Sequence, residues 1–379
     1  MHLGGLVMAL TKYKIGDLIE VVDERNNLGI REFFGININK EFMPTAANTE
    51  GLDETKYKVI RKNRFVFSGM QTGRDECIRI SMYTKQNPIL VSPAYTTFEV
   101  VATDVVLPMY FFLCFLSHEK DRFGAFLSDG SIRSNLDWPV FCDIQLNIPP
   151  LEIQKKYVDI YNAMVSNQEC YEHGLEDLKL TCDAYIENLR RQMPCEEIGP
   201  YITRQDIRNG ENGTKNVMGV STSKEFREPT SKVNRNELSN YKVVKPRQIS
   251  FVQTTHNEKV FCNAFNNTHE DIVVTSVNGV FYTDESRLLP EYLVMFFNRT
   301  EFDRYARFHS WGSARETFTW DDLIKVRIPI ADINIQKDIV DIFTVYKERK
   351  SINNRLKAQI KNICPILIKG SIEEARKEA

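Results

Sequence analysis

Apolar residues recur at alternating spacings of four and three along the segment that follows residue 150. The series is Tyr157, Tyr161, Met164, Tyr171, Leu175, Leu178, Cys182, Tyr185 and Leu189, with Gln168 as one polar interruption. These spacings fall on one face of an α-helix, so the pattern predicts a long helix with a coiled-coil seam.

A second, broader apolar series lies near the C-terminus and consists of Ile339, Phe343, Tyr346, Ile352, Leu356, Ile360, Ile363 and Leu367. It also predicts a long helix, which Pro365 is expected to bend or end. Residues 151–193 hold five Lys/Arg and eight Asp/Glu, whereas residues 330–379 hold ten and seven. Because the first segment has a net negative charge and the second a net positive charge, we expect the two helices to pack side by side. An antiparallel arrangement would place one globular domain at each end.

Outside these helices the pattern changes to short β-branched and aromatic runs separated by Gly, Asn and Pro. These strand signals lie at residues 64–67, 89–91, 98–101, 249–253, 272–275 and 280–282. Apolar stretches after Leu107-Pro108 and Leu289-Pro290 predict buried helices with proline in the first turn. The globular parts are therefore expected to be α+β.

The chain also repeats itself at an offset of roughly 180 residues. Residues 35–42 (GININKEF) match residues 219–226 (GVSTSKEF), and the later matches keep the same order to the end of each copy. Those matches pair Asp121-Arg122-Phe123 with Asp303-Arg304-Tyr305, Gly130-Ser131-Ile132-Arg133 with Gly312-Ser313-Ala314-Arg315, Trp138 with Trp320, and Ile153-Gln154-Lys155 with Ile335-Gln336-Lys337. Two copies of one fold are therefore expected, related by an approximate twofold axis.

Composition narrows the class of protein. Of 379 residues, 42% are hydrophobic, which is enough for a buried core, and 49 Lys+Arg against 51 Asp+Glu give a net charge of -2. This balance excludes a uniformly basic coat for nucleic acid, although not local basic faces. The longest apolar run, residues 105–116, is too short to span a bilayer, and the first ten residues lack the features of a secretory signal. A soluble, cytoplasmic protein without a membrane partner is expected.

Motifs for catalysis or cofactor binding are missing from the sequence. The eight cysteines form no C-x-x-C pair, and the six histidines show no paired metal-ligand spacing. The sequence contains no G-x-x-x-x-G-K-[ST], no G-x-G-x-x-G and no Asn-Pro-Pro-aromatic element of adenine methyltransferases. We therefore expect no catalytic residue, metal site or cofactor site in this chain.

The repeat and its junctions resemble the specificity (S) subunits of type I DNA restriction-modification systems. The strongest marks are residues 144–161 (IQLNIPPLEIQKKYVDIY) and 325–343 (KVRIPIADINIQKDIVDIF), in which Ile-Pro is followed by Gln and an apolar helix. The second copy departs from the first at Ile330, where the first has Pro150. The resemblance covers nearly the whole chain.

The resemblance implies target-recognition domains at residues 1–149 and 194–329, joined by long spacer helices at 150–193 and 330–379. It also implies a non-enzymatic subunit that reads a bipartite duplex DNA target and assembles with two methyltransferase subunits and with restriction (translocase) subunits. S-adenosylmethionine, ATP and Mg²⁺ would belong to those partners. Two alternatives remain at this point: the recognition subunit of a related modification-cleavage system, and a structural scaffold that binds no DNA.

Candidate DNA contacts follow from the residue types that bind base edges and phosphates. Polar segments after a strand in each copy supply Gln71, Thr72, Arg74, Gln253, Thr254 and Asn257, and an ordinary polar hairpin is the alternative. The repeated Gly-Ser-x-Arg element supplies Gly130, Ser131, Arg133, Gly312, Ser313 and Arg315, and a turn that holds Trp138 and Trp320 in the core is the alternative. Lys40 and Lys224 also recur, and a surface turn is their alternative.

The predicted globular segments are weakly charged. Residues 1–150 hold 16 Lys/Arg and 18 Asp/Glu, and residues 194–329 hold 18 of each kind. Since nonspecific affinity for DNA comes from neutralising phosphates, most of it would have to come from partners that close around the duplex. The balance favours a component of a complex over a stand-alone regulator.

Overall fold

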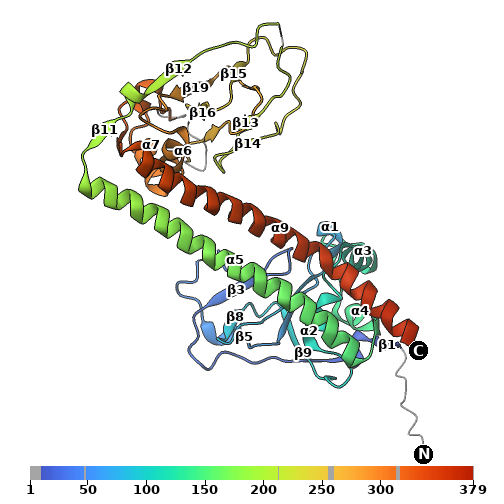
Figure 1. The fold of residues 1–379 in the computed structure, drawn as a ribbon. Helices are drawn as coiled ribbons and strands as arrows, with labels where there is room; N and C mark the ends of the chain where they lie inside the picture. The colour runs from blue at the N-terminus through green and yellow to red at the C-terminus, as the bar shows by residue number, and fades with distance from the viewer. Residues whose placement is uncertain (1–9, 47, 212, 255–259, 313–315, 379) are drawn as a thin grey trace, which may run out of the picture. The chain divides into compact units, whose positions relative to one another are not determined.

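Residues 10–46, 48–211, 213–254, 260–312 and 316–378 are described in the computed structural model. They divide into two compact units. The N-terminal unit comprises residues 1–170 and 353–379, and the central unit comprises residues 171–352. Figure 1 labels the elements of both units.

The described residues of the N-terminal unit form three small sheets. One is antiparallel in the order β2-β9-β6-β7, and another has the order β4-β3-β8-β5 with β3 and β8 parallel. The third pairs β1 with β10. The strands are β1 (Thr11–Lys14), β2 (Ile19–Val21), β3 (Phe33–Ile36), β4 (Phe42–Pro44), β5 (Lys58–Ile60), β6 (Phe65–Ser68), β7 (Arg79–Met82), β8 (Ile89–Val91), β9 (Thr96–Val100) and β10 (Gln145–Ile148).

Short helices close the core of this unit. They are η1 (Ile15–Asp17), η2 (Glu54–Lys56), α1 (Thr72–Asp75), α2 (Pro108–Leu113), α3 (His118–Leu127) and α4 (Trp138–Asp143). As predicted, α2 is buried and begins at Pro108, where a missing N–H breaks no helical hydrogen bond. Phe111 of this helix packs edge-on against Phe65 and Phe98 of the first sheet. Trp138 at the start of α4 packs against Phe98 as well, so it belongs to the same core.

The central unit repeats this order of elements. Its antiparallel sheet has the order β12-β19-β16-β17, and smaller pairs join β13 to β14, β15 to β18 and β11 to β20. The strands are β11 (Cys195–Glu197), β12 (Ile202–Gln205), β13 (Gly219–Val220), β14 (Phe226–Arg227), β15 (Lys242–Val244), β16 (Ile249–Val252), β17 (Asn263–Phe265), β18 (Ile272–Val274), β19 (Asn278–Thr283) and β20 (Arg327–Pro329). The helices are η3 (Gly199–Tyr201), α6 (Pro290–Phe297), α7 (Thr300–Phe308) and α8 (Trp320–Leu323).

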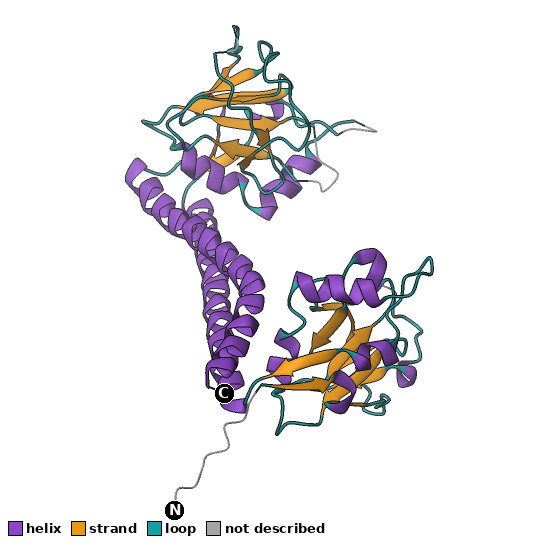
Figure 2. Cartoon of the chain, turned by 90° about the vertical axis from the view of Figure 1, so that its right-hand side faces the viewer, coloured by secondary structure: helices purple, strands orange, loops and turns teal. Residues whose placement is uncertain are grey.

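The matching order and pairing confirm the predicted α+β repeat. The sheet β12-β19-β16-β17 corresponds to β2-β9-β6-β7, and α6, α7 and α8 correspond to α2, α3 and α4. A parallel bridge between Val217 and Val273 corresponds to the parallel pair β3-β8. Figure 2 shows that short helices flank the strands within each unit.

Both predicted long helices are present as α5 (Leu151–Gln192) and α9 (Ile333–Glu378). Each contributes a segment to both units. In the N-terminal unit, Tyr157 donates to Glu374 and Gln168 donates to Asn353, so α5 and α9 run antiparallel, as expected. The polar interruption in the seam therefore has a polar partner, and both amides are buried.

Two details of the helices differ from the sequence pattern. Tyr185 is 47% exposed whereas Ile186 is fully buried, because α5 there packs its Cys182, Ile186 and Leu189 into the core of the central unit. Ile186 thus replaces Tyr185 on the buried face of α5, while Cys182 and Leu189 stay buried as the pattern predicted. Helix α9 continues through Pro365 rather than ending there. Proline has no N–H to donate to the carbonyl four residues earlier. Because Pro365 is exposed, that carbonyl lies on the solvent side of the helix.

The glutamine of each junction fastens a long helix to its own unit. Gln154 is fully buried, and its side chain donates to the carbonyls of Val105 and Pro149 and accepts from the N–H of Leu107. In the central unit Gln336 makes the equivalent bonds to Arg287, Ala331 and Leu289. The glutamine that recurs in both junctions therefore has a structural role, because it holds the start of each long helix against its unit.

The central unit has an additional attachment between its globular part and α5. Buried Arg299, directly before α7, donates to Asp183 at 3.0 Å and to Glu187 at 2.6 Å. This hydrogen bond holds the pKa of Glu187 below its ordinary value. Ser117 occupies the equivalent position of the N-terminal unit and caps α3 instead. The two copies thus share a fold but differ in how they hold α5.

Candidate nucleic-acid interface

In the N-terminal unit, the two polar segments predicted from sequence lie against each other. The β6-β7 segment (residues 69–78) includes α1, and the α3-α4 loop comprises residues 128–137. Backbone N–H groups of Gly73 and Leu136 donate to the carbonyls of Ser134 and Gly69, at 3.0 and 2.9 Å. A Cβ atom on Gly69 would lie 2.0 Å from the carbonyl oxygen of Leu136, so the contact requires glycine.

The central unit brings the corresponding segments together. The β16-β17 segment (residues 253–262) meets the α7-α8 loop (residues 309–319), since the N–H of Phe318 donates to the carbonyl of Gln253 at 2.8 Å. Thr254 also forms a β-bridge with Thr317. In each unit, described residues of the two candidate segments therefore lie against each other, and we call each such pair of segments the facing loops.

The candidate side chains divide by exposure. Arg74, Gly130, Ser131, Arg133, Thr254 and Gly312 are exposed, and Gln71 and Gln253 are half-buried. Asn257, Ser313 and Arg315 lie outside the described residues. Arg133 makes no ion pair or hydrogen bond with the part of the chain that is described, whereas Arg74 donates to Gln71 and Asp75. Arg133 is thus an exposed cation without an ion-pair partner among the described residues.

Asp129 shapes the α3-α4 loop. Its carboxylate accepts hydrogen bonds from the hydroxyl of Ser131 at 2.7 Å and from the N–H of Asn135 at 2.9 Å, which hold the pKa of Asp129 below its ordinary value. A Cβ atom on Gly130 would have no heavy atom within 4 Å, so glycine is not required for packing here. The loop has a fixed shape and an open backbone, which a phosphate can approach closely.

Thr72 does not fit the predicted role. Its side chain is fully buried, and its hydroxyl donates to the carbonyl of Gly69 within the same loop. Because that hydroxyl lies inside the protein, it supports the loop and does not contact DNA in this structure.

The prediction that Lys40 contacts DNA is also wrong for this structure. Its ammonium is buried and lies 2.7 Å from Asp121 of α3, whose carboxylate also accepts the N–H of Ile78. The backbone of Lys40 is left-handed, with a φ of 64°, which turns its side chain inward. The pair joins the β3-β4 turn to α3 and to the β6-β7 segment.

Lys224 repeats this arrangement and the same correction applies. Its buried ammonium lies 2.8 Å from Asp303 and donates to the carbonyl of Phe297, while Asp303 also accepts the N–H of Phe261. Burial lowers the pKa of Lys224, and the bond to Asp303 opposes that shift. Asp121 and Asp303 were visible in the sequence repeat, and the recurrence of opposite charges in both copies was the available signal for these pairs.

Comparison with known proteins identifies the fold's relatives. Residues 10–177 match the family described as "Type I restriction modification DNA specificity domain". This part of the chain, which holds the first copy of the repeat, is thus similar to the DNA specificity domains of type I restriction-modification systems. The resemblance predicted from the repeat is thereby confirmed.

Solved structures were compared with the whole chain, and one of them shares its architecture. An S subunit of a type I restriction-modification system from M. genitalium is 10% identical, with 98% of each chain covered and a TM-score of 0.58. An HsdS subunit from Thermoanaerobacter tengcongensis is 14% identical over 98% of this chain and 97% of that chain, with a TM-score of 0.39. No curated protein sequence matches the chain. The first structure shows that the fold extends over both recognition copies and both helices.

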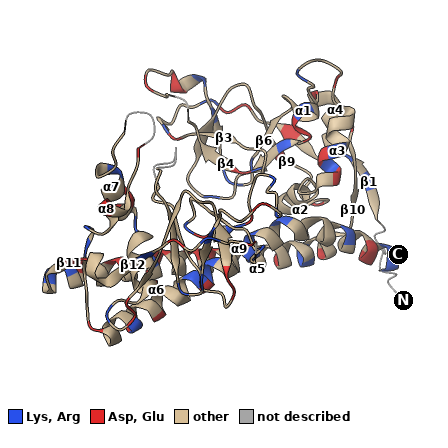
Figure 3. Cartoon of the chain, turned by 90° about the horizontal axis from the view of Figure 1, so that it is seen from above, with Lys and Arg blue, Asp and Glu red and all other residues tan. Residues whose placement is uncertain are grey.

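Positive and negative side chains are intermixed over the described residues. Figure 3 shows Lys and Arg interspersed with Asp and Glu along the helices and over both β-rich parts. Among the described residues, no group of three His, Cys, Asp or Glu side chains is arranged to hold a metal ion. In the same residues, no helix is long and apolar enough to cross a membrane.

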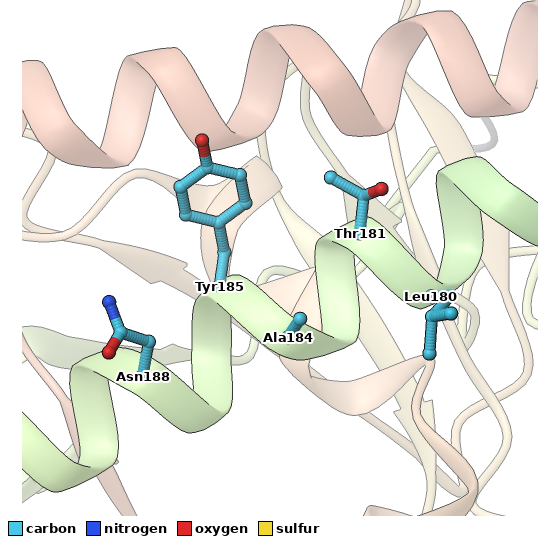
Figure 4. Close-up of a pocket in the computed structure, with 5 residues that line it drawn as sticks. All are labelled: Leu180, Thr181, Ala184, Tyr185 and Asn188. Carbon is cyan, nitrogen blue, oxygen red and sulfur yellow. The ribbon is translucent and has the colours of Figure 1, made fainter.

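A second exposed surface lies on the part of α5 that belongs to the central unit. A shallow depression there is lined by Leu180, Thr181, Ala184, Tyr185 and Asn188. Figure 4 shows Thr181, Tyr185 and Asn188 projecting to one side of α5 and Leu180 to the other. Leu180 is 70% exposed, so this stretch of helix carries apolar side chains that the described chain leaves uncovered.

Proposed function

We propose that this specificity subunit reads a bipartite duplex DNA target, with one pair of facing loops on each half-site. The observation that carries the proposal is the recurrence of the facing loops, which are joined by an equivalent backbone hydrogen bond in two units whose loop sequences differ, from Leu136 to Gly69 and from Phe318 to Gln253. A shared scaffold with different exposed side chains is what the recognition of two different half-sites requires.

In this proposal the domains follow the division expected from sequence, with recognition domains at 1–149 and 194–329. The helices at 150–193 and 330–379 set the gap between half-sites. Helix α5 has 42 residues and is therefore about 63 Å long at 1.5 Å per residue. That length equals about 18 base pairs of duplex DNA at about 3.4 Å per step.

The chain itself would carry no catalytic group. We propose that two methyltransferase subunits supply S-adenosylmethionine chemistry, and that restriction (translocase) subunits add ATP- and Mg²⁺-dependent cleavage. The near-neutral charge of the recognition copies supports this division, because partners that enclose the duplex would supply most phosphate contacts. The exposed apolar residues of α5 offer a surface for a methyltransferase helix. The complex would act in the cytoplasm, where the host DNA is.

We expect Arg133→Ala and Arg315→Ala each to weaken binding of the methyltransferase complex to its target duplex by about 10- to 100-fold, the usual value of one bidentate contact to a base. Fluorescence anisotropy with duplexes that carry one altered half-site would assign each arginine to its half-site. Arg31→Ala is the matched control, since Arg31 is exposed and pairs only weakly with Glu54 at 3.5 Å. Unchanged affinity in both variants, with the control also unchanged, would favour the scaffold alternative.

A further inference from the structure

Two exposed phenylalanines occupy equivalent positions in the two units. Phe126 lies five residues after Asp121 in α3, and Phe308 lies five residues after Asp303 in α7. Their side chains are 81% and 84% exposed. The register is fixed by the half-buried aspartates, each of which pairs with a buried lysine in its own unit.

Contacts within each unit explain why several residues recur between the two copies, but they do not explain the recurrence of the two phenylalanines. Asp121 and Asp303 recur because they neutralise buried lysines, and Gln154 and Gln336 recur because their buried side chains satisfy backbone groups. A single exposed apolar side chain needs no special explanation. A phenylalanine that is kept at the same exposed position in both copies, where its ring contributes little to the core, does need one.

Both rings stand beside the facing loops. Helix α3 leads directly into the α3-α4 loop, where the hydroxyl of Ser128 donates to the carbonyl of Gly124. The equivalent Ser310 donates to Ala306 at the end of α7. A Cβ atom on Gly124 would overlap Ile78 of the β6-β7 segment, so α3 packs tightly on that segment. In the N-terminal unit the views of Figures 1 and 3 place α1 and α3 side by side.

Cations accompany the phenylalanines. Arg122 and Arg304 precede them by four residues, which places each arginine on the same side of its helix as the ring. Both arginines are exposed, and Arg122 forms no ion pair with any described residue, whereas Arg304 forms one exposed pair with Glu301. An exposed aromatic ring next to a guanidinium is a combination that suits nucleic acid, which offers apolar base and sugar faces beside phosphates.

We propose that Phe126 and Phe308 make apolar contact with the bases or sugars of the DNA, one at each half-site, while Arg122 and Arg304 contact the adjacent phosphates. This inference rests on the proposed function and extends it to residues outside the facing loops. The contact positions each recognition copy on its half-site and is independent of the base-reading side chains of the loops.

The test uses the specificity subunit assembled with its methyltransferase subunits. Phe126→Ala and Phe308→Ala are each expected to weaken binding to the target duplex by about 10- to 100-fold, as for loss of one aromatic contact with nucleic acid. Phe126→Trp and Phe308→Trp should retain binding, because the aromatic face is kept. Val101→Ala and Val277→Ala, which change exposed valines of the same two units, should have no effect.

Three results would separate the possibilities. Weaker DNA binding by an intact complex, as judged by size-exclusion chromatography with light scattering, supports the inference. Loss of methyltransferase assembly, or unchanged affinity in both alanine variants, overturns it. If the wild-type complex itself shows no preference for its target duplex, the proposed function fails first, so the two failures are distinguishable.

Discussion

Asp121→Ala and Asp303→Ala are each expected to lower the free energy of unfolding by about 3 to 5 kcal/mol, because each leaves a buried ammonium without its carboxylate. Lys40 is buried at 2.7 Å from Asp121, and Lys224 is buried at 2.8 Å from Asp303. The carboxylates also accept hydrogen bonds from backbone N–H groups. Their removal therefore leaves one more backbone N–H without its partner in each unit. Urea unfolding followed by circular dichroism measures the change.

A double variant tests the cause. Lys40→Met combined with Asp121→Leu removes both charges and should recover much of the lost stability, since an apolar pair of similar size replaces the buried ion pair. Asp143→Ala is the matched control, because Asp143 forms an exposed ion pair with Lys14 whose removal costs at most about 1 kcal/mol. A loss of less than about 1 kcal/mol in Asp121→Ala would contradict the structure of this pair.

Gln154→Leu and Gln336→Leu are the second pair of changes with a large expected effect. Leucine fills a similar volume but leaves two carbonyls and one N–H without partners in the interior of each unit. Each unsatisfied buried group costs about 1 to 3 kcal/mol, so we expect a loss of about 3 to 6 kcal/mol and separation of the helix start from the unit. Hydrogen exchange at Leu107 and Leu289 would report the loosened contact directly.

The control for this pair is Gln192→Leu. Gln192 is an exposed glutamine at the end of α5 that bonds only to Asn188, so its replacement should change stability by about 0.5 kcal/mol or less. Equal stability of Gln154→Leu and Gln192→Leu would show that the junction glutamine is not required for the fold.

The sequence predicted the long helices because their pattern is periodic and local. Leu175, Cys182 and Leu189 are buried where the 4,3 alternation placed them. The pattern failed at Tyr185, since α5 there packs Ile186 into a core shared by α9 and the globular part, whose position sequence spacing does not reveal. Of the two outcomes predicted at Pro365, the end of the helix does not occur, because a proline on an exposed helix face leaves its freed carbonyl open to water.

The arrangement of the candidate interface residues was predicted in part. The segments that contain Arg74 and Arg133 were found from their residue types, but their contact through Gly69 and Leu136 is a tertiary feature that joins residues far apart in the sequence. Lys40 and Lys224 were misassigned because a repeated lysine signals either a ligand contact or a buried ion pair, and burial decides between them. Phe126 and Phe308 were missed because they resemble core residues until their exposure is known.

The central claim is that this chain gives a methyltransferase complex its DNA target. Single-molecule sequencing of host DNA, with and without the gene for this chain, maps the methylated adenines that depend on it. The account predicts that deletion removes methylation at one motif made of two short half-sites separated by a gap of fixed length, and that the intact gene restores it. Methylation that is unchanged by deletion, or a dependent motif that is a single uninterrupted site, would contradict the account.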